Sequence, residues 1–161
     1  MTDGAPMVRA YDPARDLAEL RALTIEHQDF SRSLESSWPE GAKIADDYVA
    51  YQQKEVATKA GCFLMAEVDG AVAGYICVIA RQEAYSPDDP ASFAWVHDIY
   101  VRPGYRRRGV ATALMAAAED FVKAHGVREL RLAVIDRNVN ARAMYVELGF
   151  RDYLRILTKP L

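Results

Sequence analysis

The chain has 161 residues, of which 51% are apolar and 27% are charged. This length and composition suit one domain with a complete hydrophobic core, and we predict a single domain over residues 1–161. The net charge of −3 provides no overall positive field, which disfavours binding to nucleic acid or to an anionic membrane surface. No apolar run reaches the ~20 residues that a bilayer span needs. The first residues, Met1–Pro6, lack the basic and apolar regions of a signal peptide, so we expect a cytoplasmic protein.

The two cysteines, Cys62 and Cys77, are expected to lie opposite each other on paired strands if the chain turns at Asp69-Gly70. In a reducing compartment they would be buried free thiols. Two cysteines without a supporting histidine cluster do not make a zinc site, and we expect no metal.

The first part of the chain predicts one short strand and two helices. Asp12 is suited to cap a helix, and Pro13 is suited to its first position. Gly61 is suited to end the second helix. In chain order we expect a strand at 8–11, a helix from 13 that weakens near 30–33, a loop at 31–39 and a helix from about 43 to 60.

The rest of the chain begins with a hairpin, because Asp69-Gly70 lies between two apolar segments. Both faces of the first of these strands are mostly apolar, which predicts a sheet covered on both sides. The expected elements are strands at 62–68, 71–80 and 93–101, a loop at 85–90, a helix at 107–125, a strand at 129–135, a helix at 140–148 and a final strand at 150–157. The order β-α-α-β-β-β-α-β-α-β predicts an α/β (α+β) fold with a single mixed sheet and helices on both faces.

The strand at 93–101 meets the next helix through a turn that contains Arg106, Arg107, Arg108 and Gly109. The first turn of a helix has backbone N–H groups without intrahelical partners, and the helix dipole adds partial positive charge there. Arginines at such a position are unfavourable unless an anion is bound, so the pattern indicates a phosphate or pyrophosphate site rather than a solvated basic helix start. Neither a Walker A motif nor a Gly-x-Gly-x-x-Gly fingerprint is present.

The segment Arg106-x-x-Gly109-x-Ala111 resembles the Gln/Arg-x-x-Gly-x-Gly/Ala signature of the GNAT superfamily of acyl-CoA-dependent N-acetyltransferases. Downstream, residues 138–150 resemble the second signature of that superfamily, Asn-x-x-Ala-x-x-x-Tyr-x-x-x-Gly-Phe. The matching residues are Asn138, Ala141, Tyr145, Gly149 and Phe150. The element order agrees over nearly the whole chain, although residues 1–60, which usually form the acceptor side, agree only in element type. The resemblance implies an acyl-CoA N-acyltransferase fold, with a mostly antiparallel sheet, and acetyl-CoA as cosubstrate.

The resemblance also implies roles for individual residues. The backbone of Ile99, Tyr100 and Val101 would pair with the pantetheine arm of the coenzyme and provide an oxyanion hole. The pyrophosphate would be held, largely through backbone amides, by Arg106, Arg107, Arg108, Gly109, Val110, Ala111 and Thr112. Asn138 would either contact the coenzyme or cap the following helix, and Asn140 is an equally suitable cap. Tyr145 would give a proton to the departing thiolate; its alternative role is that of an ordinary core tyrosine.

The general base is expected just before the pantetheine-binding segment, at His97 or Asp98. Because the pKa of histidine lies near neutrality, we rank His97 above Asp98. Glu83 is a third candidate. Strand alternation places His97 and Asp98 on opposite faces, and a structural hydrogen-bonding role is the alternative for each. The acceptor pocket is expected near the loop between the first two helices and the loop after the third strand. Its candidate lining residues are His27, Phe30, Trp38, Tyr85 and Trp95.

We therefore predict an acetyl-CoA-dependent N-acetyltransferase in which an amine attacks the thioester directly in a ternary complex, without a metal. One alternative is a catalytically silent acyl-CoA-binding sensor of the same fold. A nucleic-acid-binding module is a second alternative, but it relies on residues 106–108 alone. The amine acceptor is not indicated by the sequence. Dimerisation is common among such proteins, so a homodimer stays open, although no residue here demonstrates it.

Overall fold

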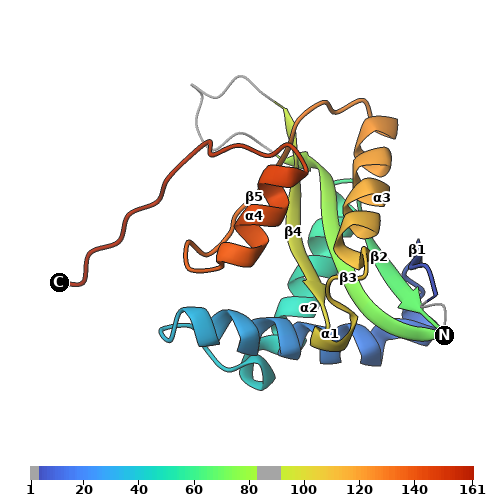
Figure 1. The fold of residues 1–161 in the computed structure, drawn as a ribbon, viewed down its shortest axis with the longest axis horizontal. Coiled ribbons are helices and arrows are strands. Elements are labelled where there is room, and N and C mark those ends of the chain that lie inside the picture. Colours follow the sequence, from blue (N-terminus) through green and yellow to red (C-terminus); the bar gives the residue numbers. More distant parts are fainter. Residues whose placement is uncertain (1–3, 83–91) are drawn as a thin grey trace.

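The computed structural model describes residues 4–82 and 92–161 and contains a five-stranded sheet in the order β1-β2-β3-β4-β5 (Figure 1). The strands are β1 (Met7–Ala10), β2 (Gly61–Val68), β3 (Ala71–Gln82), β4 (Phe93–Val101) and β5 (Leu130–Leu132). Neighbouring strands from β1 to β4 are antiparallel, and β5 pairs parallel to β4. The predicted mixed, mostly antiparallel sheet is confirmed.

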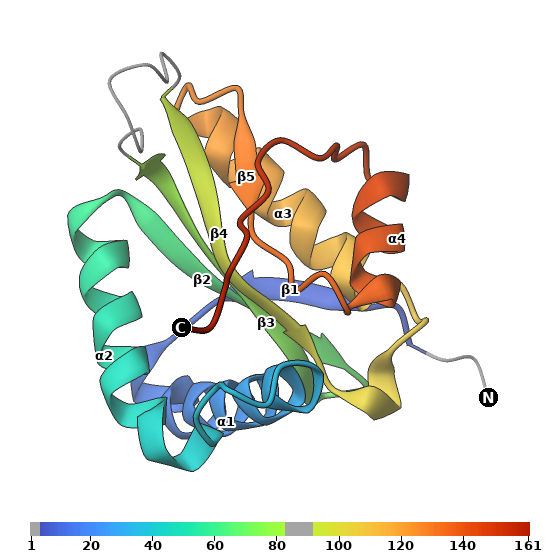
Figure 2. The same cartoon turned by 90° about the vertical axis from the view of Figure 1, so that its left-hand side faces the viewer.

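Helices cover both faces of this sheet, as predicted (Figure 2). The helices are α1 (Pro13–Leu34), α2 (Gly41–Thr58), the short 3₁₀ helix η1 (Pro103–Tyr105), α3 (Val110–Ala124) and α4 (Val139–Glu147). On β2, Ala66 and Val68 belong to the core under α3 and α4, whereas Phe63 and Met65 belong to the core under α1 and α2. Successive side chains of β2 therefore enter two different apolar cores. Burial of these cores is the main favourable contribution to the free energy of folding.

Helix α1 begins where the sequence indicates, because the Asp12 side chain accepts a hydrogen bond from the Ala14 amide at 3.0 Å. It ends later than predicted, at Leu34, so the expected loop at 31–39 is shorter. The segment after α1 folds back onto the helix, since Arg32 Nε donates to the Trp38 carbonyl oxygen at 3.1 Å. This contact supports the last turn of α1. It depends on the chain folding back, which the local sequence pattern does not indicate.

The end of α2 and the end of the chain both differ from the prediction. Gly61 does not cap α2 but begins β2, and Ala60 takes the left-handed conformation with φ 51°. The final strand expected at 150–157 is not formed (Figure 1). Leu154 and Ile156 are exposed by 71% and 85%. An extended segment becomes a strand only when a neighbouring edge supplies hydrogen-bond partners, and this segment pairs with no described strand.

The two cysteines are free thiols, as predicted. They are not opposite each other, because Cys62 lies across from Val78 and Cys77 lies across from Phe63. This register places Cys62 in the core under α3 and Cys77 in the core under α1 and α2. Burial raises the pKa of Cys62 to about 11, so this thiol is protonated near neutral pH.

Within residues 4–82 and 92–161, no helix combines the length and apolar character needed to cross a bilayer. In the same described residues, no group of three or more His, Cys, Asp or Glu side chains is arranged to hold a metal ion.

Candidate active site

Strand β4 is irregular at the residues predicted to supply the general base. Cys77 of β3 pairs with Asp98, but the next residue, Val78, pairs with Val96. His97 is therefore an extra residue in β4, which is the definition of a β-bulge. A bulge breaks the alternation of side chains, so neighbours in sequence can face the same side of the sheet.

His97 and Asp98 both face helix α2. The ring centroid of His97 lies 5.8 Å from that of Tyr51, and Asp98 Oδ2 accepts a hydrogen bond from Gln52 Nε2 at 2.6 Å. The prediction that these two residues occupy opposite faces is therefore wrong. Regular strand alternation was assumed, and the extra residue removes it.

Asp98 is the centre of a polar cluster between the sheet and the helices α1 and α2. Its Oδ2 accepts from Gln52 and, at 3.1 Å, from the Tyr75 hydroxyl. Its Oδ1 accepts from the Tyr48 hydroxyl at 3.3 Å and lies 3.4 Å from His27 Nδ1. The carboxylate is 7% exposed. Burial and the Asp98 charge raise the pKa of both tyrosines, so their hydroxyls remain protonated and can donate to it.

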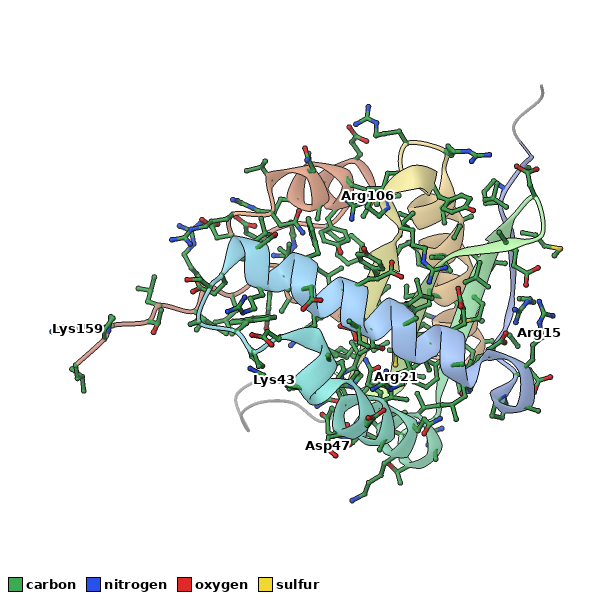
Figure 3. All side chains as sticks on the ribbon, turned by 90° about the horizontal axis from the view of Figure 1, so that it is seen from below. Arg15, Arg21, Lys43, Asp47, Arg106 and Lys159 are labelled. Atoms are coloured by element: carbon green, nitrogen blue, oxygen red, sulfur yellow. The ribbon has the colours of Figure 1, made fainter. Side chains whose placement is uncertain are left out.

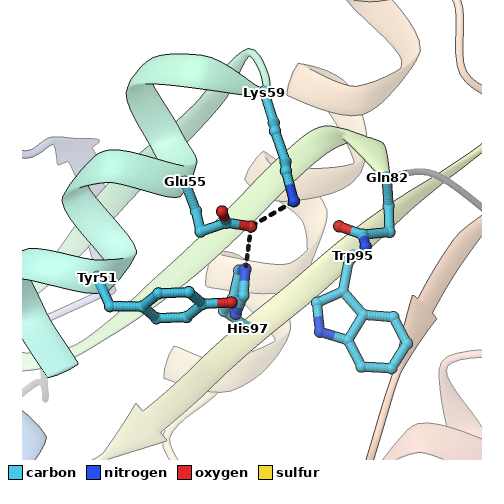
Figure 4. Close-up of a pocket in the computed structure, with 6 residues that line it drawn as sticks. All are labelled: Tyr51, Glu55, Lys59, Gln82, Trp95 and His97. Carbon is cyan, nitrogen blue, oxygen red and sulfur yellow. Dashed lines mark hydrogen bonds and ion pairs between the residues drawn. The ribbon is translucent and has the colours of Figure 1, made fainter.

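A pocket of about 240 Å³ lies beside this cluster, between α2 and the strands β3 and β4 (Figure 4). Inside it, Glu55 Oε2 is 2.6 Å from Lys59 Nζ and 4.0 Å from His97 Nε2. Burial lowers the pKa of His97, which favours its neutral form. The lining residues are Tyr51, Glu55, Lys59, Gln82, Trp95 and His97. The pocket thus combines aromatic walls with a carboxylate and an ammonium group.

The edge of β4 is open beyond the bulge. Among the described residues, β5 pairs with β4 only from Ala94 to Val96, whereas β3 follows β4 as far as Val101. The backbone at 98–101 is therefore paired with β3 on one side, and no described strand pairs with it on the other. Such an edge can receive an extended chain through main-chain hydrogen bonds. Ile99, Tyr100 and Val101, the predicted pantetheine-binding residues, lie along this edge.

Tyr145 of α4 lies in the core under α3 and α4, and its ring packs edge-on against Phe150 at a centroid distance of 5.7 Å. Burial raises the pKa of Tyr145 to about 12, and the negative charge of Asp98 adds to this effect. Because Asp98 belongs to the α1–α2 side, the two groups lie on opposite sides of the sheet yet within electrostatic reach. The sheet thus has a protonated phenol on one side and the buried carboxylate cluster on the other.

The turn between η1 and α3 has an unusual backbone. Arg107 has φ 62° and Gly109 has φ 76°, so two residues of this turn are in the left-handed region. A non-glycine residue in this region costs about 1 kcal/mol or more, and alternating conformations of this kind gather N–H groups into an anion-binding concavity. The amides of Val110, Ala111 and Thr112 follow as the first turn of α3. A Cβ added at Gly109 would meet no atom within 4 Å, so the space beside this backbone is open.

The three arginines of the turn have different surroundings. Arg106 turns back toward α1: its Nε donates to the Val101 carbonyl oxygen at 2.9 Å, and its guanidinium lies 4.9 Å from the Phe30 ring centroid (Figure 3). Arg108 pairs with Asp69 at 3.4 Å. Arg107 is exposed on the surface of the turn. The side chain of Arg106 thus braces the turn against α1, and Arg107 is the arginine with the freest side chain to meet an incoming anion.

The other predicted site residues have separate places in the structure. Asn138 caps α4, since its side chain accepts a hydrogen bond from the Ala141 amide at 3.3 Å. Of the predicted acceptor-lining residues, His27 touches the Asp98 cluster and Trp95 lines the pocket. Trp38 is 42% exposed on the α1–α2 connection. Glu83 and Tyr85 lie outside the described residues.

Sequence reasoning missed the contribution of α2. Tyr48, Gln52, Glu55 and Lys59 follow one another at spacings of four, three and four residues, which places them on one helical face. This polar face, turned toward the sheet rather than toward solvent, was the available signal. Tyr75 was also missed, because within β3 it looks like a core aromatic residue.

Comparison with known proteins shows the family of the chain. The family model described as "Acetyltransferase (GNAT) family" matches residues 27–150. The chain belongs to the GNAT family of acetyltransferases. An aminoglycoside N(6′)-acetyltransferase type 1 of Stenotrophomonas maltophilia is 27% identical over 158 residues, which cover 98% of this chain and 94% of that protein. An L-2,4-diaminobutyric acid acetyltransferase of Nocardia farcinica is 34% identical over 101 residues, which cover 63% of this chain and 49% of that protein.

The GNAT fold is also found among solved structures. The aminoglycoside acetyltransferase AAC(6′)-Iy, in complex with the bisubstrate analogue CoA-S-monomethyl-acetylneamine, superposes with a TM-score of 0.70 at 22% identity. The match covers 98% of this chain and 99% of that one. The chain is thus an N-acetyltransferase of the GNAT family, with the fold that its sequence indicates.

Proposed function

We propose that this GNAT protein transfers an acetyl group from acetyl-CoA to a primary amine by direct attack in a ternary complex. The observation that carries the proposal is that the open edge of β4 leads directly to the left-handed turn before α3. The edge is suited to an extended pantetheine arm, and the turn is suited to a pyrophosphate. The spacing between them is fixed by one continuous segment, 99–111.

The residues of the turn fit a diphosphate. Backbone N–H groups from Arg107 to Thr112 would hold its oxygens, and the exposed Arg107 guanidinium would add a charge-assisted contact. Gly109 leaves room for the close approach, since a side chain there would occupy the open space beside the backbone. Arg106 supports the turn from behind through its bond to the Val101 carbonyl oxygen. Asn138 positions α4, which carries Tyr145.

The chemistry follows from the groups on the two sides of the β4 edge. A backbone N–H near Ile99 or Tyr100 would stabilise the negative charge that develops on the thioester oxygen during attack. Tyr145 would give its proton to the departing thiolate. With a pKa of about 12, the phenol keeps this proton throughout the neutral range until a negative charge forms beside it.

The proton that leaves the amine requires a base on the α1–α2 side, where the bulge places both His97 and Asp98. The acceptor would enter from this side, along the polar cluster and the adjoining pocket. The Glu55 carboxylate and the aromatic walls of this pocket are suited to amines that carry further polar groups. The two relatives named above are acetyltransferases of an aminoglycoside and of a diamino acid, which guides the choice of acceptors to test.

The experiment is an acceptor screen with acetyl-CoA, in which free thiol release and the mass of the product are measured together. The panel contains neamine, L-2,4-diaminobutyrate, spermidine and a lysine-containing peptide. We expect equimolar CoA and N-acetylated amine with at least one member. Tyr145→Phe should lower kcat by about 10²-fold with little change in CoA affinity. Tyr153→Phe, which changes an exposed tyrosine in the C-terminal segment, is the matched control.

Tight acetyl-CoA binding without acetylation of any panel member would favour the silent acyl-CoA sensor over the enzyme. Absence of binding would remove both functions. Cytoplasmic location and homodimerisation stay predictions from the sequence.

A further inference from the structure

His27 of α1 lies at the meeting point of the Asp98 cluster and the open edge of β4. Its Nδ1 is 3.4 Å from Asp98 Oδ1, and its ring stacks on Tyr100 with a centroid distance of 5.5 Å and an interplanar angle of 29°. Tyr100 belongs to the segment along which the thioester is proposed to lie. The imidazole is therefore held over the strand end where acetyl transfer would occur.

Asp98 is poorly placed to meet an acceptor amine itself. Gln52, Tyr75 and Tyr48 already donate hydrogen bonds to its two oxygens. The carboxylate is also buried, whereas the His27 side chain is 24% exposed. Asp98 is built to hold its charge in one place, and His27 is the neighbouring group that an acceptor can reach.

His97 is also poorly placed for this task. Its side chain is 11% exposed and its Nε2 faces Glu55 at 4.0 Å, inside the side pocket. Burial lowers the pKa of this imidazole, so it is a weak proton acceptor near neutral pH. Its ring contacts Tyr51 rather than the residues that line the open edge of β4.

We propose that His27 Nε2 accepts the proton of the attacking amine and that Asp98 is a positioning residue acting through His27 Nδ1. With Nδ1–H directed at Asp98, the lone pair of the neutral ring lies on Nε2. The acceptor ammonium gives one proton to Nε2, and its nitrogen lone pair then forms the C–N bond as the C–S bond breaks. The thiolate takes the Tyr145 proton. The second proton of the amine then reprotonates the Tyr145 phenolate through solvent, and the proton on His27 is released to solvent, so that both side chains are restored. This assignment rests on the proposed acetyltransferase function and names the base that it requires.

Among the charged and titratable groups near His27, Asp98 is in position to contact its ring nitrogen Nδ1. Glu26, its neighbour on α1, is paired with Arg102 at 2.9 Å. Arg106 lies in the turn after β4. Its guanidinium is 5.7 Å from the ring centroid of Tyr100, the residue on which His27 stacks. The remaining titratable groups of the cluster are Tyr48 of α2 and Tyr75 of β3, and a raised pKa keeps both neutral. Asp98 is therefore the group that we expect to hold the His27 ring through Nδ1.

The test uses the full chain, acetyl-CoA and the best acceptor of the screen, and compares pH profiles of kcat/KM. We expect His27→Gln to lower kcat/KM by about 10²-fold or more. Asp98→Asn should also lower kcat/KM across the profile. In the double variant with His27→Gln the two losses should not add, because Asp98 acts only through the His27 ring that it holds. His125→Gln, which changes an exposed histidine at the end of α3, is the matched control.

A second measurement keeps the assignment testable if Asp98→Asn does not fold. The His27→Ala variant should recover activity when imidazole is added, whereas a purely structural histidine would give no such rescue. Parental kcat/KM in His27→Gln, the expected loss of kcat/KM in His97→Gln instead, or absence of imidazole rescue would each overturn the proposal. Because these outcomes require an active parent, they differ from failure of the proposed function, in which the parent itself releases no CoA.

Discussion

A single added methyl group at Gly74 should disturb both stability and catalysis, because the backbone of β4 lies directly against this glycine of β3. A Cβ at Gly74 would lie 2.3 Å from the Tyr100 carbonyl oxygen and 3.1 Å from Val101 Cα. An ordinary close carbon–oxygen contact is about 3.3 Å. The neighbouring atoms are backbone and cannot rotate away, so Gly74→Ala must push the end of β4 aside by about 1 Å.

Overpacking of this kind costs about 1–3 kcal/mol. For a chain of this size, 1 kcal/mol corresponds to about 2–4 °C in Tm, so we expect Tm to fall by about 2–12 °C. The displaced segment contains the proposed pantetheine edge, and an error of about 1 Å there can cost about 10²-fold in turnover. Thermal unfolding followed by circular dichroism and thiol release with acetyl-CoA measure the two effects.

Gly104→Ala is the control for stability, because a Cβ at Gly104 would meet no atom within 4 Å. If Gly74→Ala kept both the Tm of this control and the turnover of the parent, the close approach of β3 to β4 would not position the site. The reasoning that links the strand end to catalysis would then be refuted.

Two further predictions concern the turn and the buried ion pairs. Gly109→Val should weaken CoA binding by at least about 10-fold, as measured by calorimetry. A β-branched residue is strained at φ 76°, and its side chain would fill the open space beside the backbone. Unchanged affinity would argue against this turn as the pyrophosphate site. Arg9→Met should cost about 3–5 kcal/mol in urea unfolding at pH 7, because it removes the nearer of the two arginines that pair with the buried Asp16 carboxylate, at 2.6 Å against 3.6 Å for Arg15. The hydrogen bond from Arg9 lowers the pKa of Asp16, so the parent has this stabilisation above the unfolded pKa of about 3.9 and loses it as pH falls through the folded value. The urea midpoint of the parent should therefore drop below about pH 4, and an equal drop in Arg9→Met would contradict the assignment to this pair.

Local chemistry explains why much of the fold could be predicted from the sequence. The Asp69-Gly70 hairpin forms as expected, with φ values of 52° and 79° at the two residues. Strand β4 begins at Phe93 and ends at Val101, the limits that its apolar pattern predicts. The arginine–glycine turn identified the proposed phosphate-binding backbone, since helix starts and left-handed glycines leave clear local signals.

The errors arise where distant parts of the chain decide the outcome. The extra residue at His97 follows from the register of β4 against β3, which no local pattern records. The face of α2 that carries Tyr48 and Gln52 acquires meaning only through its contact with Asp98. A strand is expected from the sequence at residues 150–157, but no described strand pairs with them. Sequence patterns therefore predicted the backbone of the proposed coenzyme side better than the side-chain arrangement of the proposed acceptor side.

The central claim is that the open edge of β4 and the turn before α3 hold one coenzyme molecule together. The most direct measurement is a titration of ¹⁵N-labelled protein with CoA, followed by two-dimensional amide NMR. We predict that the largest and saturable shifts occur at two sets of amides, Ile99–Val101 and Arg107–Ala111, at the same CoA concentration. Shifts confined to another part of the chain, or no shifts at millimolar CoA, would contradict this account.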